Sequence, residues 1–224
     1  MKKTGLLKFL DASDLPAALK GYLAGVLAGN LPLSLREALK KDPGGFTAGI
    51  GRLLGEAGLA LGCAGDRALF ISGFDEHNLA PDRLEAALAE MLAVVFLRSE
   101  GFSGISFIGR GVGRTADLSA VRGGLDYAFE VCSARTPAED LSVDFLERKY
   151  DKKIWQARVS CRKRGLARAG LVLVSGPPAF SGFEPDERLA ALARGLYERK
   201  NDPPGTHVCL LARGRAAVFP AWGA

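Results

Sequence analysis

Two acidic residues on neighbouring predicted strands are the residues of this sequence most suited to chemistry. The segments RTADLSAV and LDYAFEVCSA, residues 114–121 and 125–134, alternate as β-strands do, and they carry Asp117 and Glu130. Because successive side chains of a strand point to opposite faces, Glu130 and Cys132 share the face opposite to the apolar residues. Adjacent strands can therefore bring the two carboxylates together.

This pair has the chemistry of a metal site. Asp117 and Glu130, with the main-chain carbonyl of Val131 beside them, offer the hard oxygen ligands that Mg²⁺ and Mn²⁺ prefer. An ion held there could activate a water molecule and neutralise charge on a scissile phosphate. The sequence therefore predicts a Mg²⁺ or Mn²⁺ site.

The predicted elements around the pair indicate the fold that positions it. A helix is predicted over 82–100, where apolar residues recur every three or four positions, and a strand over 103–108 leads into the two central strands. After them come a helix over 138–164, a fully buried strand over 171–175, a helix over 184–200, and short strands over 206–212 and 216–219. This order predicts an α/β fold, a mixed sheet with helices on both faces.

The first part of the chain has a different composition, and we place a domain boundary between residues 1–77 and 78–224. The first region is rich in Ala, Leu and Gly and favours short helices, one of them starting at a capping box formed by Ser34 and Glu37. A strand is predicted over 67–73. Since no residue here has a chemical signature, this region is interpreted as a partner-binding or substrate-binding accessory, or as extra packing.

The central motifs resemble those of the PD-(D/E)xK nuclease superfamily, most closely its restriction-endonuclease-like and Holliday-junction-resolvase-like branches. The resemblance covers about residues 81–175 and depends on the order of elements, on Ala116 and Asp117, and on Glu130 and Cys132 two positions apart. It implies a restriction-endonuclease-like core and hydrolysis of nucleic acid, DNA in the first place, assisted by Mg²⁺ or Mn²⁺. Two residues depart from the pattern: Ala116 replaces a proline, and Cys132 replaces the catalytic lysine.

The replaced lysine decides whether the chain can cleave. A thiol, with an ordinary pKa of about 8.5, cannot supply the lysine's positive charge. On the long helix that follows, Lys149, Lys153, Gln156 and Ser160 form a polar stripe beside an apolar one. In some branches of the superfamily a lysine on this helix replaces the missing one and a glutamine shapes the site. The resemblance thus implies Lys153, or Lys152, and Gln156 as catalytic residues, together with the motif residues Asp117, Glu130 and Cys132.

The resemblance also implies a further metal ligand. Related nucleases often carry a glutamate on the first helix of the core, and Glu90 is better placed for this role than Glu85. The implied ligands are therefore Asp117, Glu130, the carbonyl of Val131, and Glu90.

Positive charge is concentrated in one segment of the chain. The net charge is +5, and residues 147–168 hold nine Lys or Arg and two acidic residues, a net of +7. This segment is either a solvated helix face or a surface that faces nucleic acid. Trp155 lies nearly opposite the helix's apolar stripe, and we expect it to pack against the first region rather than stack on a base. The candidate phosphate contacts are Arg110, Arg114, Arg135, Lys149, Lys152 and Arg158.

Several other classes are disfavoured. The four cysteines are far apart and there are two histidines, so neither a zinc site nor a disulfide framework is indicated. The apolar stretch over 15–33 is interrupted by Lys and Pro, so we expect no membrane association and a cytoplasmic location. A homodimer is compatible with the sequence.

Three functions remain open. The first is a metal-dependent nuclease. The second is a module of the same fold that binds nucleic acid without cleaving it, which the replacement at Cys132 favours. The third is a protein-interaction module that works through its helical first region. Two acids on neighbouring strands argue mildly against the third, because burying them without a cation costs stability.

Overall fold

The structure is a computed structural model that describes residues 3–29, 34–80, 82–109, 116–134, 136–176 and 182–223. Within these residues a seven-stranded mixed sheet has the order β1-β2-β3-β4-β6-β7-β5. Its strands are β1 (Ser103–Phe107), β2 (Leu118–Arg122), β3 (Leu125–Ala134), β4 (Arg168–Ser175), β5 (Glu184–Pro185), β6 (Thr206–Ala212) and β7 (Arg215–Phe219). The side chain of Ser34, on which the predicted capping box depends, lies outside the described part.

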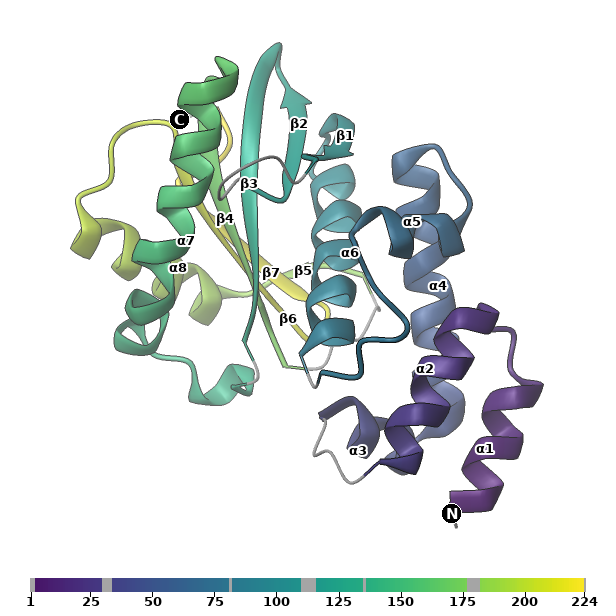
Figure 1. Cartoon of the computed structure of the whole chain (residues 1–224). Helices are drawn as coiled ribbons and strands as arrows, with labels where there is room; N and C mark the ends of the chain where they lie inside the picture. The colour runs from purple at the N-terminus through teal and green to yellow at the C-terminus, as the bar shows by residue number, and fades with distance from the viewer. Residues whose placement is uncertain are drawn as a thin grey trace.

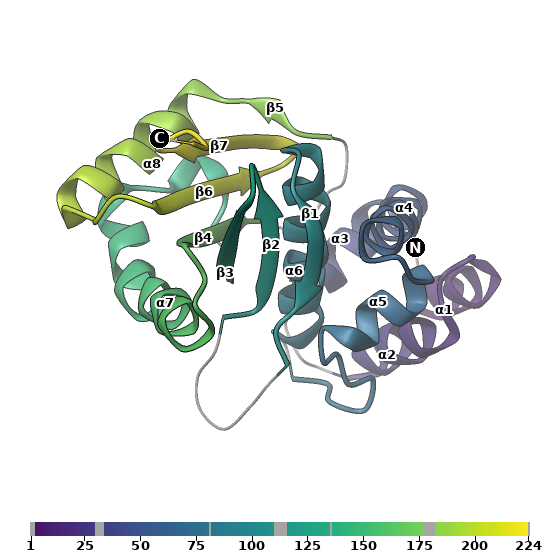
Figure 2. The same cartoon turned by 90° about the horizontal axis from the view of Figure 1, so that it is seen from above.

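Helices cover both faces of this sheet (Figure 1), so the predicted mixed α/β fold is confirmed. Helix α6 (Arg83–Ser99) packs on one face, and α7 (Val143–Arg164) and α8 (Glu187–Lys200) pack on the other (Figure 2). Strands β1, β2 and β3 form an antiparallel meander, whereas β3, β4 and β6 run parallel. Strand β4 lies between the two helical layers and is buried on both faces, as its continuous apolar run predicts.

The first region is helical, as predicted, and it packs against α6 on the side away from the sheet (Figure 2). Its helices are α1 (Lys3–Ala12), α2 (Ala17–Ala28), α3 (Ser34–Lys41), α4 (Pro43–Leu61) and α5 (Gly65–Ile71). One apolar cluster runs from Leu6 of α1 through Leu88 of α6 to Phe129 of the sheet. The predicted boundary at 77/78 therefore crosses a shared core.

The strand predicted over 67–73 is wrong, because this segment forms helix α5 and the turn after it. A short apolar run cannot be assigned to a strand or a helix from periodicity alone. Here the consecutive residues Ala68 and Leu69 are both buried, a pattern that a helix produces and an alternating strand does not. A Cβ at Gly65 would lie 2.7 Å from the Leu54 carbonyl oxygen, so glycine allows α4 and α5 to pack closely.

Both helices on the second face start later than predicted, for local reasons. Helix α7 starts after Ser142, whose hydroxyl accepts a hydrogen bond from the N–H of Phe145 at 3.3 Å, and a 3₁₀ turn, η1 (Ala138–Asp140), precedes it. Helix α8 starts after Asp186, whose carboxylate accepts from the N–H of Leu189 at 2.8 Å. Both caps satisfy backbone donors that the first helical turn leaves unpaired.

The apolar stripe of α7 packs onto the sheet as predicted: Leu146, Tyr150, Ile154, Ala157 and Cys161 are all buried. In the described part of the chain, no helix combines the length and the apolar character that crossing a membrane requires.

Candidate active site

Asp117 lies directly before the first residue of β2 and is held against β3. Its N–H donates to the Phe129 carbonyl at 2.9 Å, and its carboxylate Oδ2 accepts from the Val131 N–H at 2.7 Å. On the other side, the N–H of Ala116 donates to the Ser160 hydroxyl of α7 at 2.7 Å. The carboxylate of Asp117 thus accepts the hydrogen bond that a main-chain carbonyl of a neighbouring strand would otherwise accept from Val131.

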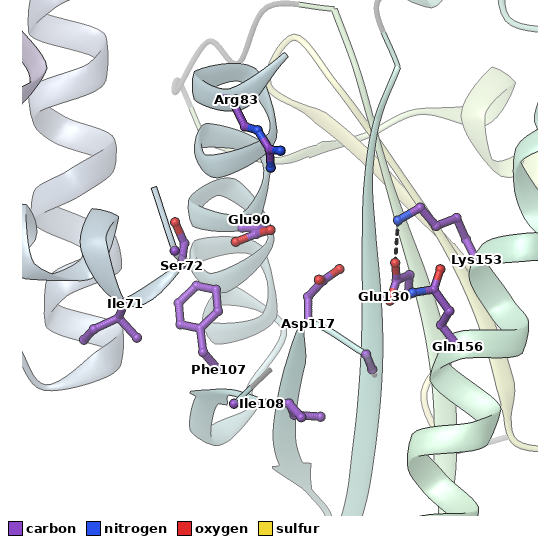
Figure 3. Close-up of a pocket in the computed structure, with 13 residues that line it drawn as sticks. Ile71, Ser72, Arg83, Glu90, Phe107, Ile108, Asp117, Glu130, Lys153 and Gln156 are labelled. Carbon is purple, nitrogen blue, oxygen red and sulfur yellow. Dashed lines mark hydrogen bonds and ion pairs between the residues drawn. The ribbon is translucent and has the colours of Figure 1, made fainter. Parts of the chain in front are cut away.

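Glu130 lies directly across from Asp117, and both point into one cavity (Figure 3), as the strand pattern predicts. The Glu130 side chain is 1% exposed. Its pKa is raised to about 7, by burial first and then by the charge of Asp117, while the hydrogen bond and charge of Lys153 oppose both effects. Glu130 Oε2 is buried and makes no hydrogen bond with any described residue. The site therefore holds a buried carboxylate with an unused oxygen.

Lys153 reaches this carboxylate from α7, as the resemblance implies. Its Nζ donates to Glu130 Oε1 at 2.5 Å, and its side chain is 30% exposed. Burial disfavours the ammonium form, but the hydrogen bond with Glu130 and the charges of Glu130 and Asp117 outweigh burial, so the pKa of Lys153 lies above its ordinary value. A permanent positive charge therefore stands beside the two acids.

Cys132 is placed differently from the other predicted catalytic residues. It lies two residues after Glu130 on β3, within the apolar cluster between the sheet and α7. It does not line the cavity. Burial raises the pKa of its thiol, although Lys153 and Lys149 oppose this effect. The thiol is therefore neutral and contributes packing.

The cavity has a volume of about 540 Å³ and brings five predicted residues together: Glu90, Asp117, Glu130, Lys153 and Gln156. These come from α6, the start of β2, β3 and α7 (Figure 3). Glu85 of the same helix is instead buried and does not line the cavity.

The opposite wall of the cavity was not predicted. It consists of Ile71 and Ser72 at the end of α5, with Phe107 of β1 and Arg83 of α6 (Figure 3). The sequence carries no signal for this wall, because it depends on how the first region packs against the core. The helical first region therefore contributes surface to the cavity itself.

The donor set can be compared with what a divalent ion requires. Among the described residues, no three His, Cys, Asp or Glu side chains lie close enough together to hold a metal ion. Mg²⁺, however, usually keeps several waters and takes only one or two carboxylates from a protein. In a strand the N–H and C=O of one residue point to the same side, so the Val131 carbonyl is directed toward the edge where Asp117 lies. The unpartnered Oε2 of Glu130, Asp117 and this carbonyl fit a hydrated ion.

The predicted phosphate contacts have different placements. Arg110, Arg114 and Arg135 lie outside the described residues. Lys149 and Lys152 are exposed on α7. The guanidinium of Arg158 forms an ion pair with the buried Asp202 and donates to the Thr206 hydroxyl at 3.4 Å, so its placement is that of a structural residue.

The prediction that Trp155 packs against the first region is wrong. Its side chain is 51% exposed on α7, which lies across the sheet from the first region (Figure 2). The helical position opposite the apolar stripe faces solvent.

Comparisons with known proteins add little to this geometry. No protein-family model matches the chain, and no curated protein matches it. A solved structure with weak similarity is a CdiA-CT/CdiI toxin and immunity complex from Burkholderia pseudomallei, with 13% sequence identity and a TM-score of 0.35 over 61% of this chain and 85% of that chain. Function is therefore inferred from the site itself.

Proposed function

We propose that this chain is a PD-(D/E)xK-like nuclease that hydrolyses phosphodiester bonds of nucleic acid, DNA in the first place, with Mg²⁺ or Mn²⁺. The observation that supports the proposal most strongly is the meeting of Asp117, Glu130 and Lys153 in one cavity, although they come from three separate elements (Figure 3). These are the residue types that the resemblance requires, with the lysine supplied from α7.

The metal ligands in this proposal are Asp117, Glu130 and the carbonyl of Val131. A bound Mg²⁺ or Mn²⁺ would supply charge neutralisation at the phosphate and a more acidic water. The N–H of Val131 fixes the Asp117 carboxylate at 2.7 Å, and the surrounding strands fix Glu130, so both ligands are rigid. Glu90, on the cavity wall formed by α6, would act through a water molecule.

Lys153 has the role that the superfamily's lysine plays. Its ammonium lies at the carboxylate pair, inside the cavity, and remains charged because the pair raises its pKa. A fixed positive charge in a partly dehydrated cavity stabilises negative charge that develops on a phosphate oxygen. Gln156 lies one turn along the same wall, where its amide can orient the substrate.

A nucleic-acid-binding module that does not cleave is the second candidate. Two observations favour it: Cys132 occupies the usual lysine position, and Lys153 is engaged with Glu130 in an ion pair at 2.5 Å. Such a module would bind nucleic acid without a metal, and its affinity would fall steeply with salt. A homodimer and a cytoplasmic location stay predictions.

The test is cleavage of labelled single-stranded, duplex and branched DNA and of RNA in Mg²⁺ or Mn²⁺. The variants are Asp117→Asn and Glu130→Gln, with Glu56→Gln on the exposed face of α4 as a control. Loss of cutting in both site variants but not in the control would support the nuclease. Salt-sensitive binding without cutting by any of the proteins would support the second candidate. Absence of both binding and cutting would leave only the protein-interaction function.

A further inference from the structure

Helix α7 has all its acidic side chains paired by the neighbouring helix α8. Its three acidic residues, Asp144, Glu147 and Asp151, all form ion pairs with Arg199 and Lys200 at the end of α8. The Lys200 ammonium lies 2.7 Å from Glu147 and 2.8 Å from Asp151. The acids of α7 are thus neutralised by the neighbouring helix.

Among the cations of α7, the half-buried Lys153 and Arg158 pair with Glu130 and Asp202, whereas the exposed ones have no such compensation. Six exposed basic side chains on this helix form no ion pair with any described residue: Arg148, Lys149, Lys152, Arg162, Lys163 and Arg164. Uncompensated charge of one sign on one helix attracts an anionic partner, and a phosphate backbone is such a partner.

Trp155 lies at the edge of this basic surface, with Lys152 on one side and Asp151, which pairs with Lys200, on the other. It is 51% exposed, and its ring can therefore be reached by a partner. With 3.6 residues per turn, Lys152 lies about 60° and Gln156 about 100° around the helix from Trp155. Gln156 lines the cavity, so Lys152 lies between the cavity and the tryptophan.

The far wall of the cavity also presents apolar surface. Phe107 is half-buried and Ile71 is exposed, and both line the cavity on the side away from Lys153 (Figure 3). An aromatic ring and an aliphatic side chain can accept the face of an unpaired base, which a phosphate or a sugar would not require.

From these observations we infer that the substrate is single-stranded nucleic acid, or an unpaired end, with one base stacked on Trp155. The strand runs from the cavity across Lys152, which contacts its phosphate, to the exposed indole. This inference rests on the proposed function and adds the substrate class. Only an unpaired base can offer its π-face to Trp155, because the bases of a duplex are already stacked on each other.

The test measures binding without metal, so that cleavage plays no part. Short oligothymidylate, oligouridylate and a duplex of equal length are titrated against wild type, Trp155→Ala, Trp155→Phe and Leu59→Ala. The control removes another exposed apolar side chain, Leu59 on α4, which is 71% exposed against 51% for Trp155. In a Trp222→Phe background, quenching of the remaining tryptophan reports stacking directly.

The expected result is a loss of single-strand affinity of about 5- to 150-fold for Trp155→Ala, which corresponds to one base stack. Trp155→Phe should retain most of the affinity, the duplex should be little affected, and Leu59→Ala should bind as wild type does. Stronger binding of oligothymidylate would identify the strand as DNA, and stronger binding of oligouridylate would identify it as RNA.

Three results would overturn the inference. An equal loss for single strands and duplex would make Trp155 a general contact, and no loss would leave it without a role. Indole emission that responds to protein concentration rather than to oligonucleotide would assign this face to contact between copies of the chain. Metal-dependent cutting that is lost in Asp117→Asn would still support the proposed nuclease in each of these cases, so the two proposals fail separately.

Discussion

Replacing Glu130 by glutamine is expected to stabilise the metal-free fold at neutral and alkaline pH. The Glu130 side chain is 1% exposed, and burial, followed by the charge of Asp117, raises its pKa from 4.5 to about 7. Between these two pH values the folded chain keeps a proton that the unfolded chain releases, so stability is highest below pH 4.5 and falls as the pH rises. At about 1.4 kcal/mol for each pKa unit, the loss amounts to roughly 3 kcal/mol.

The assay is urea unfolding of wild type and Glu130→Gln in the presence of a chelator, from about pH 5 to about pH 8. Over this range the stability of the wild type should fall relative to that of the variant by about 2–3 kcal/mol. Glu56→Gln, on the exposed face of α4, is the matched control and should follow the wild type. Parallel curves for wild type and Glu130→Gln would refute the reasoning, because they would mean that Glu130 has an ordinary pKa.

Three further predictions concern the metal, the thiol and a buried ion pair. Because a cation requires ionised Glu130, calorimetry should show Mn²⁺ affinity rising as the pH passes about 7; an affinity independent of pH would contradict the pKa of Glu130. Cys132→Ser should change kcat/KM by less than about threefold, since the thiol does not line the cavity; a large loss in a cleavage assay would give it a catalytic role. Arg158→Ala should lower the free energy of unfolding, measured in urea, by about 3 kcal/mol, because Asp202 then stays buried without its cation. This value is the lower end of the range for removing one partner of a buried ion pair. An unchanged midpoint would mean that Asp202 is solvated.

The central pair was predictable because strand alternation is strict. A buried sheet with helices on both faces leaves little freedom in which face Glu130 occupies, so the residues on either side of it fix its direction. The apolar stripe of α7 likewise fixed the side of the helix on which Lys153 and Gln156 lie. Local periodicity therefore fixed the faces on which these side chains lie, whereas the choice of Lys153, Gln156 and Glu90 came from the resemblance.

The features that the sequence did not reveal depend on contacts between distant segments. The strand predicted over 67–73 is helix α5, whose end forms a cavity wall only because Gly65 lets α5 pack closely on α4. The partner of Arg158 lies 44 residues away, at Asp202, so no spacing rule separates this structural cation from the exposed Lys152. The packing predicted for Trp155 was wrong because its helical position shows only that it points away from the core. It does not show whether solvent or another segment lies on that side.

The most direct test of the account is cleavage by Lys153→Ala, because the proposal depends on this lysine replacing the one absent at Cys132. Labelled DNA is cut under single-turnover conditions in Mn²⁺ by wild type, by Lys153→Ala, and by Lys8→Ala, whose exposed side chain lies on α1. The account predicts a loss of about 10²–10³-fold for Lys153→Ala, with Mn²⁺ binding retained and Lys8→Ala unchanged. Cutting at the wild-type rate by Lys153→Ala would contradict it.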